Sequence, residues 1–401
     1  MNCNHKKIKE TDLKEALEIS FYDSIKALNT SEWEGFNANH ENIYLSVPYL
    51  EALEKTLCNE IEFCYVMFHN SSKKLVAVAY FQFAKFVDSK ANCEDSICAV
   101  QGIIKSKILK KIEAKMLVCG NIFSCGENGF MYSSQLSATT AYFNLNRAID
   151  QLKKSEKRKK FSIILMKEYW PETTTNSDLF LAENYTDFMI DVNMRLKIHP
   201  LWKSFDDYLQ SMTTKFRTRA NGVFKKSKLL VQKNFEPEDI TSYAERIDEL
   251  YGFVINKADY NFGTINAKTF LGLKKSLKNN FHFTGYFLND ILVGFSTAMV
   301  NSGVMDANFV GLDYQYNNQY ALYQRILYDF VEISIKENLT ELRLGRTAEE
   351  IKSCLGAEPV NMKLYIKHKN AVPNKVVKQM IKSVKPSEFE LRKPFKAKFI
   401  S

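Results

Sequence analysis

Basic side chains gather in one short stretch of the second half of the sequence. Lys215, Arg217 and Arg219 alternate there, and three further lysines follow by position 228. The range 197–233 contains nine basic and two acidic residues, a net charge of +7, and the whole chain of 401 residues has a net charge of +9. Because the arginine side chain binds phosphate through two parallel hydrogen bonds, this cluster could hold a nucleotide, coenzyme A or a tRNA backbone. The alternative is a solvated, basic face of a helix.

A second candidate for anion binding follows a short apolar strand expected at 341–344. The segment 344–352 reads LGRTAEEIK, so that Gly345 ends the strand and Arg346 stands before a helix with the spacing of a capping box. An arginine beside a helix N-terminus favours anions. We therefore expect Gly345, Arg346 and Lys352 to bind a phosphate or carboxylate. We also expect alanine at Arg346 or Lys352 to leave folding nearly unchanged, since exposed charges contribute little to stability.

The motifs that the sequence lacks disfavour several other classes of enzyme. There is no GxSxG, Walker A or dinucleotide-binding GxGxxG sequence, which disfavours α/β-hydrolases, P-loop NTPases and Rossmann enzymes. The six histidines show neither HExxH nor paired spacing, so we expect no metal site. The eight cysteines match no CxxC spacing, and we interpret them as reduced thiols of a cytosolic protein.

The elements that position these residues occur in the same order twice. Each half is expected to contain a hairpin, a third strand, a loop, a helix and a fourth strand. In the first half they are expected at 61–69, 74–86, 115–119, 138–154 and 161–166, and in the second at 281–288, 291–300, 304–310, 319–336 and 341–344. Helices are expected before the hairpins at 11–29, 47–57, 204–212 and 240–257. This repetition predicts a duplicated α+β domain.

The length of the chain suits two domains, followed by a tail. We expect an N-terminal domain over 1–175, a C-terminal domain with the substrate cleft over 176–370, and a basic amphipathic tail over 371–401. The tail should form a helix that docks against the second domain and tolerates truncation. The alternative is that this helix lies on an anionic membrane or a nucleic acid. No run of about 20 apolar residues predicts a membrane span, and no signal peptide is evident, so we expect a cytoplasmic protein without stable membrane insertion.

Five segments carry a resemblance to a known family: 45–54 (LSVPYLEALE), 117–129 (LVCGN followed by GENG), 202–209 (WKSFDDYL), 215–219 (KFRTR) and 344–352 (LGRTAEEIK). In their order and spacing they resemble the GNAT acyltransferase superfamily, and the duplication resembles its double-domain branch, which includes the FemAB-type peptidoglycan aminoacyltransferases. The resemblance implies tandem GNAT-like domains with mixed central sheets flanked by helices. It also implies that Arg346 and Lys352 contact phosphate groups in the substrate cleft.

The activity implied by this resemblance is transfer of an acyl or aminoacyl group from a phosphate-bearing donor to an amine. The donor would be acyl-CoA or aminoacyl-tRNA, with tRNA then a partner, and the acceptor would be a small-molecule amine or a cell-wall precursor. In GNAT enzymes a glycine-rich turn holds the pyrophosphate of the donor, but the corresponding segment 313–320 contains no glycine. This departure favours aminoacyl-tRNA, or a degenerate module that only binds an anionic ligand, over acetyl-CoA.

Acyl transfer to an amine also needs a group that removes a proton and a group that protonates the leaving group. Asp306 lies on the expected central strand of the second half, and Tyr320 and Tyr323 lie at the start of the helix that follows it. We predict these three as the catalytic residues. The alternative for each of them is a role in packing.

Overall fold

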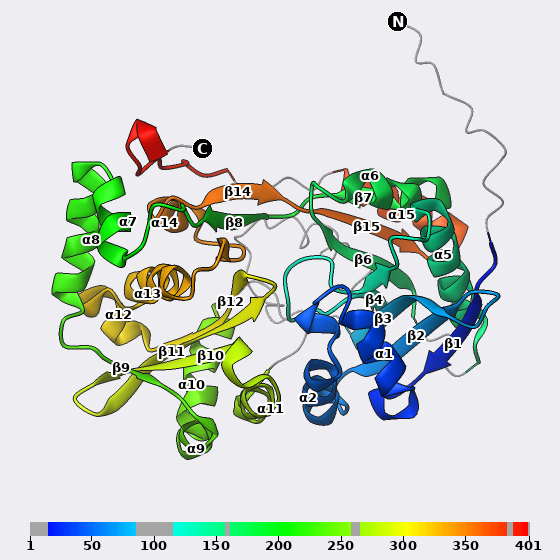
Figure 1. Cartoon of the computed structure of the whole chain (residues 1–401), viewed down its shortest axis with the longest axis horizontal. Coiled ribbons are helices and arrows are strands. Elements are labelled where there is room, and N and C mark those ends of the chain that lie inside the picture. The colour runs from blue at the N-terminus through cyan, green and yellow to red at the C-terminus, as the bar shows by residue number, and fades with distance from the viewer. Residues whose placement is uncertain (1–14, 86–114, 157–160, 258–264, 383–387, 400–401) are drawn as a thin grey trace, which may run out of the picture.

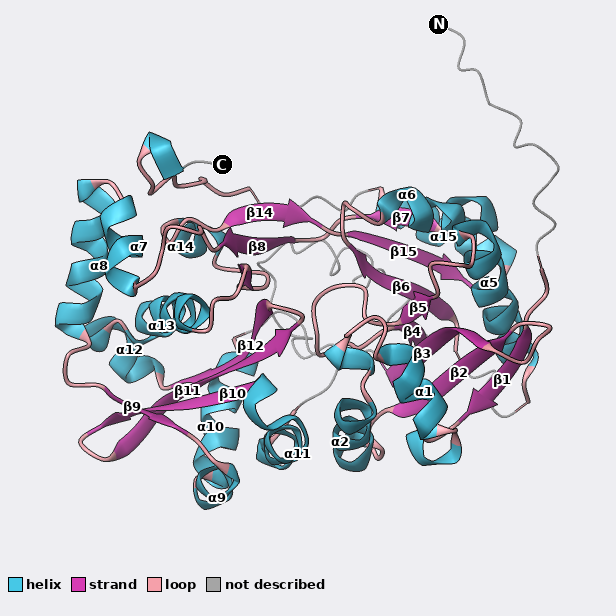
Figure 2. Ribbon diagram, in the orientation of Figure 1, coloured by secondary structure: helices cyan, strands magenta, loops and turns pink. Residues whose placement is uncertain are grey.

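Two mixed β-sheets, each flanked by helices, lie side by side in the computed structural model, which describes residues 15–85, 115–156, 161–257, 265–382 and 388–399 (Figures 1 and 2). The strand order is β1-β2-β3-β4-β6-β15-β7 in the first sheet, with β5 paired to β3, and β14-β8-β13-β12-β11-β10-β9 in the second. The predicted tandem α+β architecture is therefore confirmed.

The strands of the first sheet are β1 (Glu18–Tyr22), β2 (Glu62–His69), β3 (Leu75–Lys85), β4 (Lys115–Cys119), β5 (Phe130–Tyr132), β6 (Ile163–Tyr169), β7 (Thr186–Phe188) and β15 (Lys363–His368). Those of the second sheet are β8 (Val192–Lys197), β9 (Val231–Asn234), β10 (Phe281–Leu288), β11 (Ile291–Asn301), β12 (Val304–Leu312), β13 (Glu341–Arg343) and β14 (Glu358–Asn361). The first half contains the helices α1 (Thr30–Asn37), α2 (Val47–Leu57), α5 (Ala138–Lys154) and α6 (Thr174–Ser177). The later helices are α7 (Phe205–Ser211), α8 (Thr214–Lys226), α9 (Pro237–Ser242), α10 (Ala244–Ile255), α11 (Ala267–Leu277), α12 (Tyr314–Tyr320), α13 (Leu322–Lys336), α14 (Glu349–Ser353) and α15 (Ala371–Ile381).

The two sheets have corresponding strand orders, and the chain passes once from the first sheet to the second and once back. The edge strand β7 of the first sheet leads directly into β8 of the second, and the edge strand β14 of the second leads into β15 of the first. Strands β7 and β15 thus belong to the first sheet, although the sequence analysis places them in the range 176–370. The exchange ties the two sheets together covalently.

One hydrophobic core is shared by both halves. Leu50 and Leu53 of α2 pack in the same cluster as Phe270 of α11 and Phe295 of β11. A second core lies on the other face of the second sheet, under α7, α8 and α13. The second sheet is therefore covered by α7, α8 and α13 on one face and by α10 and α11 on the other, where α2 of the first half packs against α11.

Two expected elements are wrong. The described part of the range 11–29 is not helical: β1 and a short 3-10 helix (Ile25–Ala27) replace the expected helix, because Ile19 and Phe21 alternate with their neighbours and pair along β2. The loop expected at 311–318 is also largely absent. Strand β12 runs on to Leu312, and α12 then begins after Asp313, whose side chain accepts a hydrogen bond from the backbone of Gln315. Without glycine, this segment has no residue that disfavours a helix.

The helix of the tail docks on the first sheet. Val377 and Ile381 of α15 pack with Leu364 and Ile366 of β15 and with Ile163 of β6, all in the first sheet. Strand β15 falls in the range 176–370 expected for the second domain, but the strand exchange places it in the first sheet. The helix therefore packs on the first sheet through a strand from the range of the second domain.

The end of the tail does reach the second half, and truncation there should be costly. The ring of Phe395 packs so closely on Gly356 that a Cβ atom at that glycine would lie 2.0 Å from the ring, and the ring centroid lies 5.2 Å from that of Trp202. We expect Phe395→Ala to lower the free energy of unfolding by about 2–4 kcal/mol, as for other large aromatic truncations. Urea denaturation measures this change. The exposed Val372→Ala should change it by less than about 0.5 kcal/mol, and equal effects of the two variants would contradict the packing.

Candidate active site

The central strands of the second sheet separate at Asp306. Strands β12 and β13 run parallel and pair at three positions, the last of which joins Asp306 to Arg343. Beyond this point β12 continues to Leu312, whereas β13 ends. In open sheets with parallel strands, the carboxyl ends of diverging strands are the usual place for a ligand.

Asp306 is buried at this point of separation, with an exposed fraction of 4%. Its Oδ2 atom accepts a hydrogen bond of 2.7 Å from the hydroxyl of Tyr44, in the first half of the chain. Its Oδ1 atom has no hydrogen-bond partner in the described structure, and Nη1 of Arg343 lies 3.8 Å away. Burial raises the pKa of Asp306 to about 6, while Arg343 and Tyr44 limit the rise. At neutral pH the carboxylate is therefore ionised and readily accepts a proton.

Further buried polar atoms without partners lie around the same point. They are Oδ1 of Asn308 and both amide atoms of Asn193, a residue of β8 with no exposed surface. Gly345 follows β13, and its carbonyl oxygen accepts a hydrogen bond from the backbone N–H of Met194, next to Asn193. Its φ is +70°, and only the carbonyl oxygen of Ala307 lies within 4 Å of the position that a Cβ atom would take. Because buried polar groups are almost always hydrogen-bonded, several orphaned atoms in one place suit a ligand.

A row of charged side chains holds Arg343 beside Asp306. Glu341 accepts hydrogen bonds from Arg343 at 2.7 Å and from Arg195 at 2.6 Å. Burial favours the neutral form of Glu341, but the two arginines outweigh it and hold its pKa below the ordinary value. Both guanidinium groups also stack on Trp170 from the first half, at 4.5 and 5.1 Å from the ring centroid.

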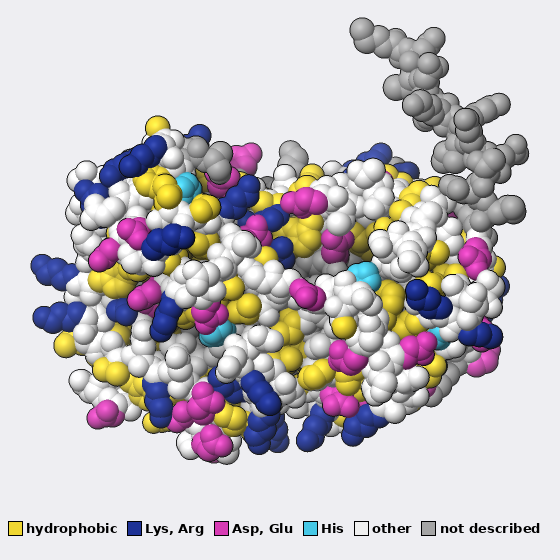
Figure 3. All heavy atoms as spheres, in the orientation of Figure 1, with side chains coloured by type: hydrophobic (Ala, Val, Ile, Leu, Met, Phe, Trp, Pro, Cys, Tyr) yellow, Lys and Arg dark blue, Asp and Glu magenta, His cyan; other side chains and the backbone are white. Residues whose placement is uncertain are grey.

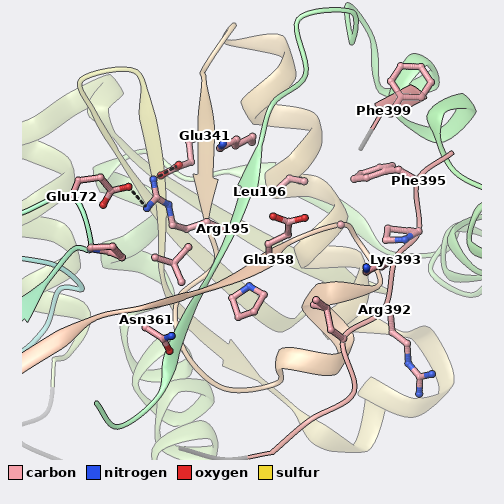
Figure 4. A pocket seen from close by; sticks show the side chains of 17 residues that line it. Glu172, Arg195, Leu196, Glu341, Glu358, Asn361, Arg392, Lys393, Phe395 and Phe399 are labelled. Atoms are coloured by element: carbon pink, nitrogen blue, oxygen red, sulfur yellow. Dashed lines mark hydrogen bonds and ion pairs between the residues drawn. The ribbon is translucent and has the colours of Figure 1, made fainter. Parts of the chain in front are cut away.

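The outer end of this row opens into a pocket of about 510 Å³ beside β8 and β14. Figure 4 shows Arg195 between Glu172 and Glu341, with Glu358 and Phe395 on the opposite wall. Glu172, at 3.3 Å from Arg195, comes from the loop after β6. The charged row therefore connects the buried carboxylate of Asp306 with a cavity that has walls from both halves of the chain.

Arg346 and Lys352 do lie together, but in a buried cluster rather than on an open surface. Arg346 forms an ion pair with Glu168 of β6, and the amine of Lys352, 3% exposed, donates to the carbonyl oxygen of Arg346. Burial lowers the pKa of Lys352 to about 8, and the carboxylate of Glu168 raises that of Arg346 against the effect of burial. The expectation that alanine at either position leaves folding unchanged is therefore wrong. The outer part of Arg346, with a side chain 30% exposed, remains accessible to a ligand.

The other predicted site residues lie on the far side of the sheet from Asp306. Lys215, Arg217 and Arg219 lie on α8, which packs in the core under α13. Tyr320 ends α12, and Tyr323 lies in the first turn of α13; both pack against this same core. Burial raises the pKa of Tyr323 to about 12. In the described structure, the predicted residues thus fall into two groups separated by the second sheet.

The described residues hold no group of three or more His, Cys, Asp or Glu side chains that could bind a metal ion. None of the described helices is both long and apolar enough to cross a membrane.

Solved structures share this fold at low sequence identity. FemX is 10% identical over 86% of this chain and 96% of its own, with a TM-score of 0.51. A tandem GNAT protein from the clavulanic acid biosynthesis pathway is 8% identical over 88% of this chain and 99% of its own, with a TM-score of 0.50. No family model and no curated protein matches the chain in sequence. The fold is a tandem GNAT-like fold, in agreement with the resemblance seen in the sequence.

Proposed function

We propose that the chain is an N-acyltransferase that moves an acyl or aminoacyl group to an amine where β12 and β13 separate. The observation that carries the proposal is Asp306: a buried carboxylate with a raised pKa and one oxygen without a hydrogen-bond partner, at the strand divergence of a GNAT-like domain. In this reading Oδ1 of Asp306 takes a proton from the ammonium form of the acceptor. The amine nitrogen then bonds to the acyl carbon, and the bond from that carbon to the thiol sulfur or ribose oxygen of the donor breaks with its electron pair going to the donor. The leaving atom takes up the second proton that the nitrogen loses.

Tyr44 supports this role by fixing the carboxylate. Burial raises the pKa of Tyr44 well above its ordinary value, so its hydroxyl stays protonated and donates to Oδ2. The other oxygen is then the one that faces the acceptor. The amide of Asn193, which has no partner, is suited to donate to the acyl carbonyl, and the unpartnered Oδ1 of Asn308 is suited to accept a hydrogen bond from the acceptor.

The donor is acyl-CoA or aminoacyl-tRNA, and the helix start after β12 weighs against a pyrophosphate at that turn. Asp313 caps α12 there and accepts a hydrogen bond of 2.7 Å from Arg246. A buried carboxylate at a helix N-terminus occupies the place that a phosphate would take there. The proposed acceptor is a small-molecule amine or a cell-wall precursor with a free amine.

Thermal-shift measurements with acetyl-CoA, longer acyl-CoAs and charged tRNA test the donor class. A ligand at about 100 times its Kd should stabilise the folded chain by roughly 2.7 kcal/mol. The donor so found is then incubated with a panel of amines, and mass spectrometry detects the acylated product. Stabilisation without product would favour a module that only binds an anionic ligand, and no stabilisation by any donor would contradict the proposal.

Removing the charge of Arg343 should move the pH dependence of transfer. Arg343 favours the ionised form of Asp306, so Arg343→Met should raise the pKa of Asp306. The acid limb of kcat/KM should therefore move to higher pH, by about one unit. Lys336→Met, which removes an exposed charge at the end of α13, is the control and should leave the limb in place. An unshifted limb in Arg343→Met would mean that the titrating group is not Asp306.

A further inference from the structure

A separate cavity of about 450 Å³ lies between α8, α13 and α14. Arg219, Gly222 and Lys226 of α8 form one side of it, and Tyr328 of α13 and Leu355 after α14 contribute to the others. This volume lies within the range of small-ligand sites. The cavity is on the face of the second sheet that α7, α8 and α13 cover, away from Asp306.

Positive charge lines one side of this cavity without being neutralised. Lys215, Arg219, Gly222 and Lys226 are spaced four, three and four residues apart, so they form one stripe along α8. Both cations of the cavity are exposed, and no carboxylate within the described residues makes an ion pair with Arg219 or Lys226. Figure 3 shows Lys and Arg side chains projecting at the end of the molecule where α8 lies.

The remaining walls are apolar or already neutralised. Glu350 is paired with Arg392 at 2.5 Å, so its negative charge is balanced. Val223, Ile351 and Leu355 supply apolar surface, and Gly222 leaves the mouth open because nothing lies within 4 Å of its missing Cβ. A ligand with an anionic group at one end and a flat apolar body at the other fits this combination.

We propose that this cavity binds a nucleoside phosphate, with the phosphate on Arg219 and Lys226 and the base against the apolar wall. CoA carries this chemistry, since it ends in adenosine 3′,5′-bisphosphate and a long arm separates this nucleotide from the acyl group. The terminal adenosine of aminoacyl-tRNA carries the acyl group on its own ribose, so in this cavity it would hold that group across the sheet from Asp306. The inference rests on the proposed function only where it identifies the ligand as part of the acyl donor. Binding of the nucleotide to this cavity can be measured without acyl transfer.

Isothermal titration calorimetry with adenosine 3′,5′-bisphosphate, and with a short RNA ending in CCA, tests the site on the full chain. We expect the wild type to bind the bisphosphate, and Arg219→Glu/Lys226→Glu to bind it at least tenfold more weakly. The matched control Lys268→Glu/Lys275→Glu makes the same change in charge on exposed positions of α11 and should bind as the wild type does. Asp306→Asn should also retain binding, which separates this site from the chemistry.

Gly222→Leu is a second variant that keeps the charge but fills the mouth, and helix α8 should accept it because leucine favours helices more than glycine does. It should weaken binding as the charge reversal does. Tighter, salt-sensitive binding of the RNA than of the bisphosphate would contradict CoA as the source of the ligand. Failure of the wild type to bind the bisphosphate, or equal affinity in the wild type and both cavity variants, would overturn the proposal.

Discussion

Asp306→Asn is expected to reduce kcat for acyl transfer by a factor of about 10²–10⁴ while the chain stays folded. An amide cannot accept the proton that the acceptor must lose, and this factor is the usual contribution of general acid–base catalysis. The wild-type rate should rise with pH through about 6, since the carboxylate is the active form. The matched control Asp290→Asn lies in the exposed β10–β11 turn and should retain wild-type kcat.

The same substitution should raise the stability of the folded chain, although it lowers kcat. The folded state holds the Asp306 proton more tightly than the unfolded state, because its pKa is about 6 instead of 3.8. Ionisation of this group therefore costs stability as pH rises from about 4 to 6, and the cost persists above pH 6. Asp306→Asn should then be more stable than the wild type at pH 7, by about 1–3 kcal/mol. A variant that is both inactive and less stable would indicate a structural role.

Glu168→Ala is expected to lower the free energy of unfolding by about 3–5 kcal/mol, the cost of breaking a buried ion pair by removing one partner. Glu168, 1% exposed, pairs with Arg346 and with Lys167 at 2.6 Å, and its Oε2 atom accepts the backbone N–H of Gly126 at 2.9 Å. Its loss leaves Lys167 buried and Arg346 partly buried without a carboxylate. The measurement is urea denaturation at pH 7.

The control for this prediction is Glu172→Ala, since Glu172 also pairs with an arginine but its side chain is 64% exposed. It should cost less than about 1 kcal/mol. Burial works against the charge of Glu168, but Arg346 and Lys167 hold its pKa below 4.5. Its stabilising effect is therefore present above pH 4.5 and is lost as pH falls through the lowered pKa. Equal costs for the two variants would contradict a buried interdomain pair.

The elements predicted with the right bounds are those whose own sequence is strongly patterned. The helices 47–57 and 138–154 and the strands 115–119 and 281–288 have long apolar faces or continuous apolar runs, and they agree with α2, α5, β4 and β10. Strands β8, β14 and β15 have only four to six residues each, and their places depend on the exchange between sheets. No local pattern encodes that exchange.

The site could be predicted from the sequence only in part for the same reason. Asp306 could be singled out from its place on the expected central strand of the second half. Asn193 and Arg195 belong to the same site only because β8 pairs in the second sheet. Tyr44 belongs to it through a hydrogen bond to Asp306, which lies 262 residues away in the sequence. The alternation of Glu341, Leu342 and Arg343 did signal a strand with one charged face, which sequence reasoning overlooked.

A crystal structure of the chain with a non-transferable donor analogue tests the central claim most directly. The probes are a CoA thioether in which a methylene ketone replaces the thioester, and an aminoacyl-adenosine with an amide in place of the ester. We predict that the acyl carbonyl of one of them lies between β12 and β13, with the acceptor side open to Oδ1 of Asp306 and a hydrogen bond from Asn193 or Asn308. An analogue bound with its acyl group elsewhere, and with all three residues untouched, would contradict the account.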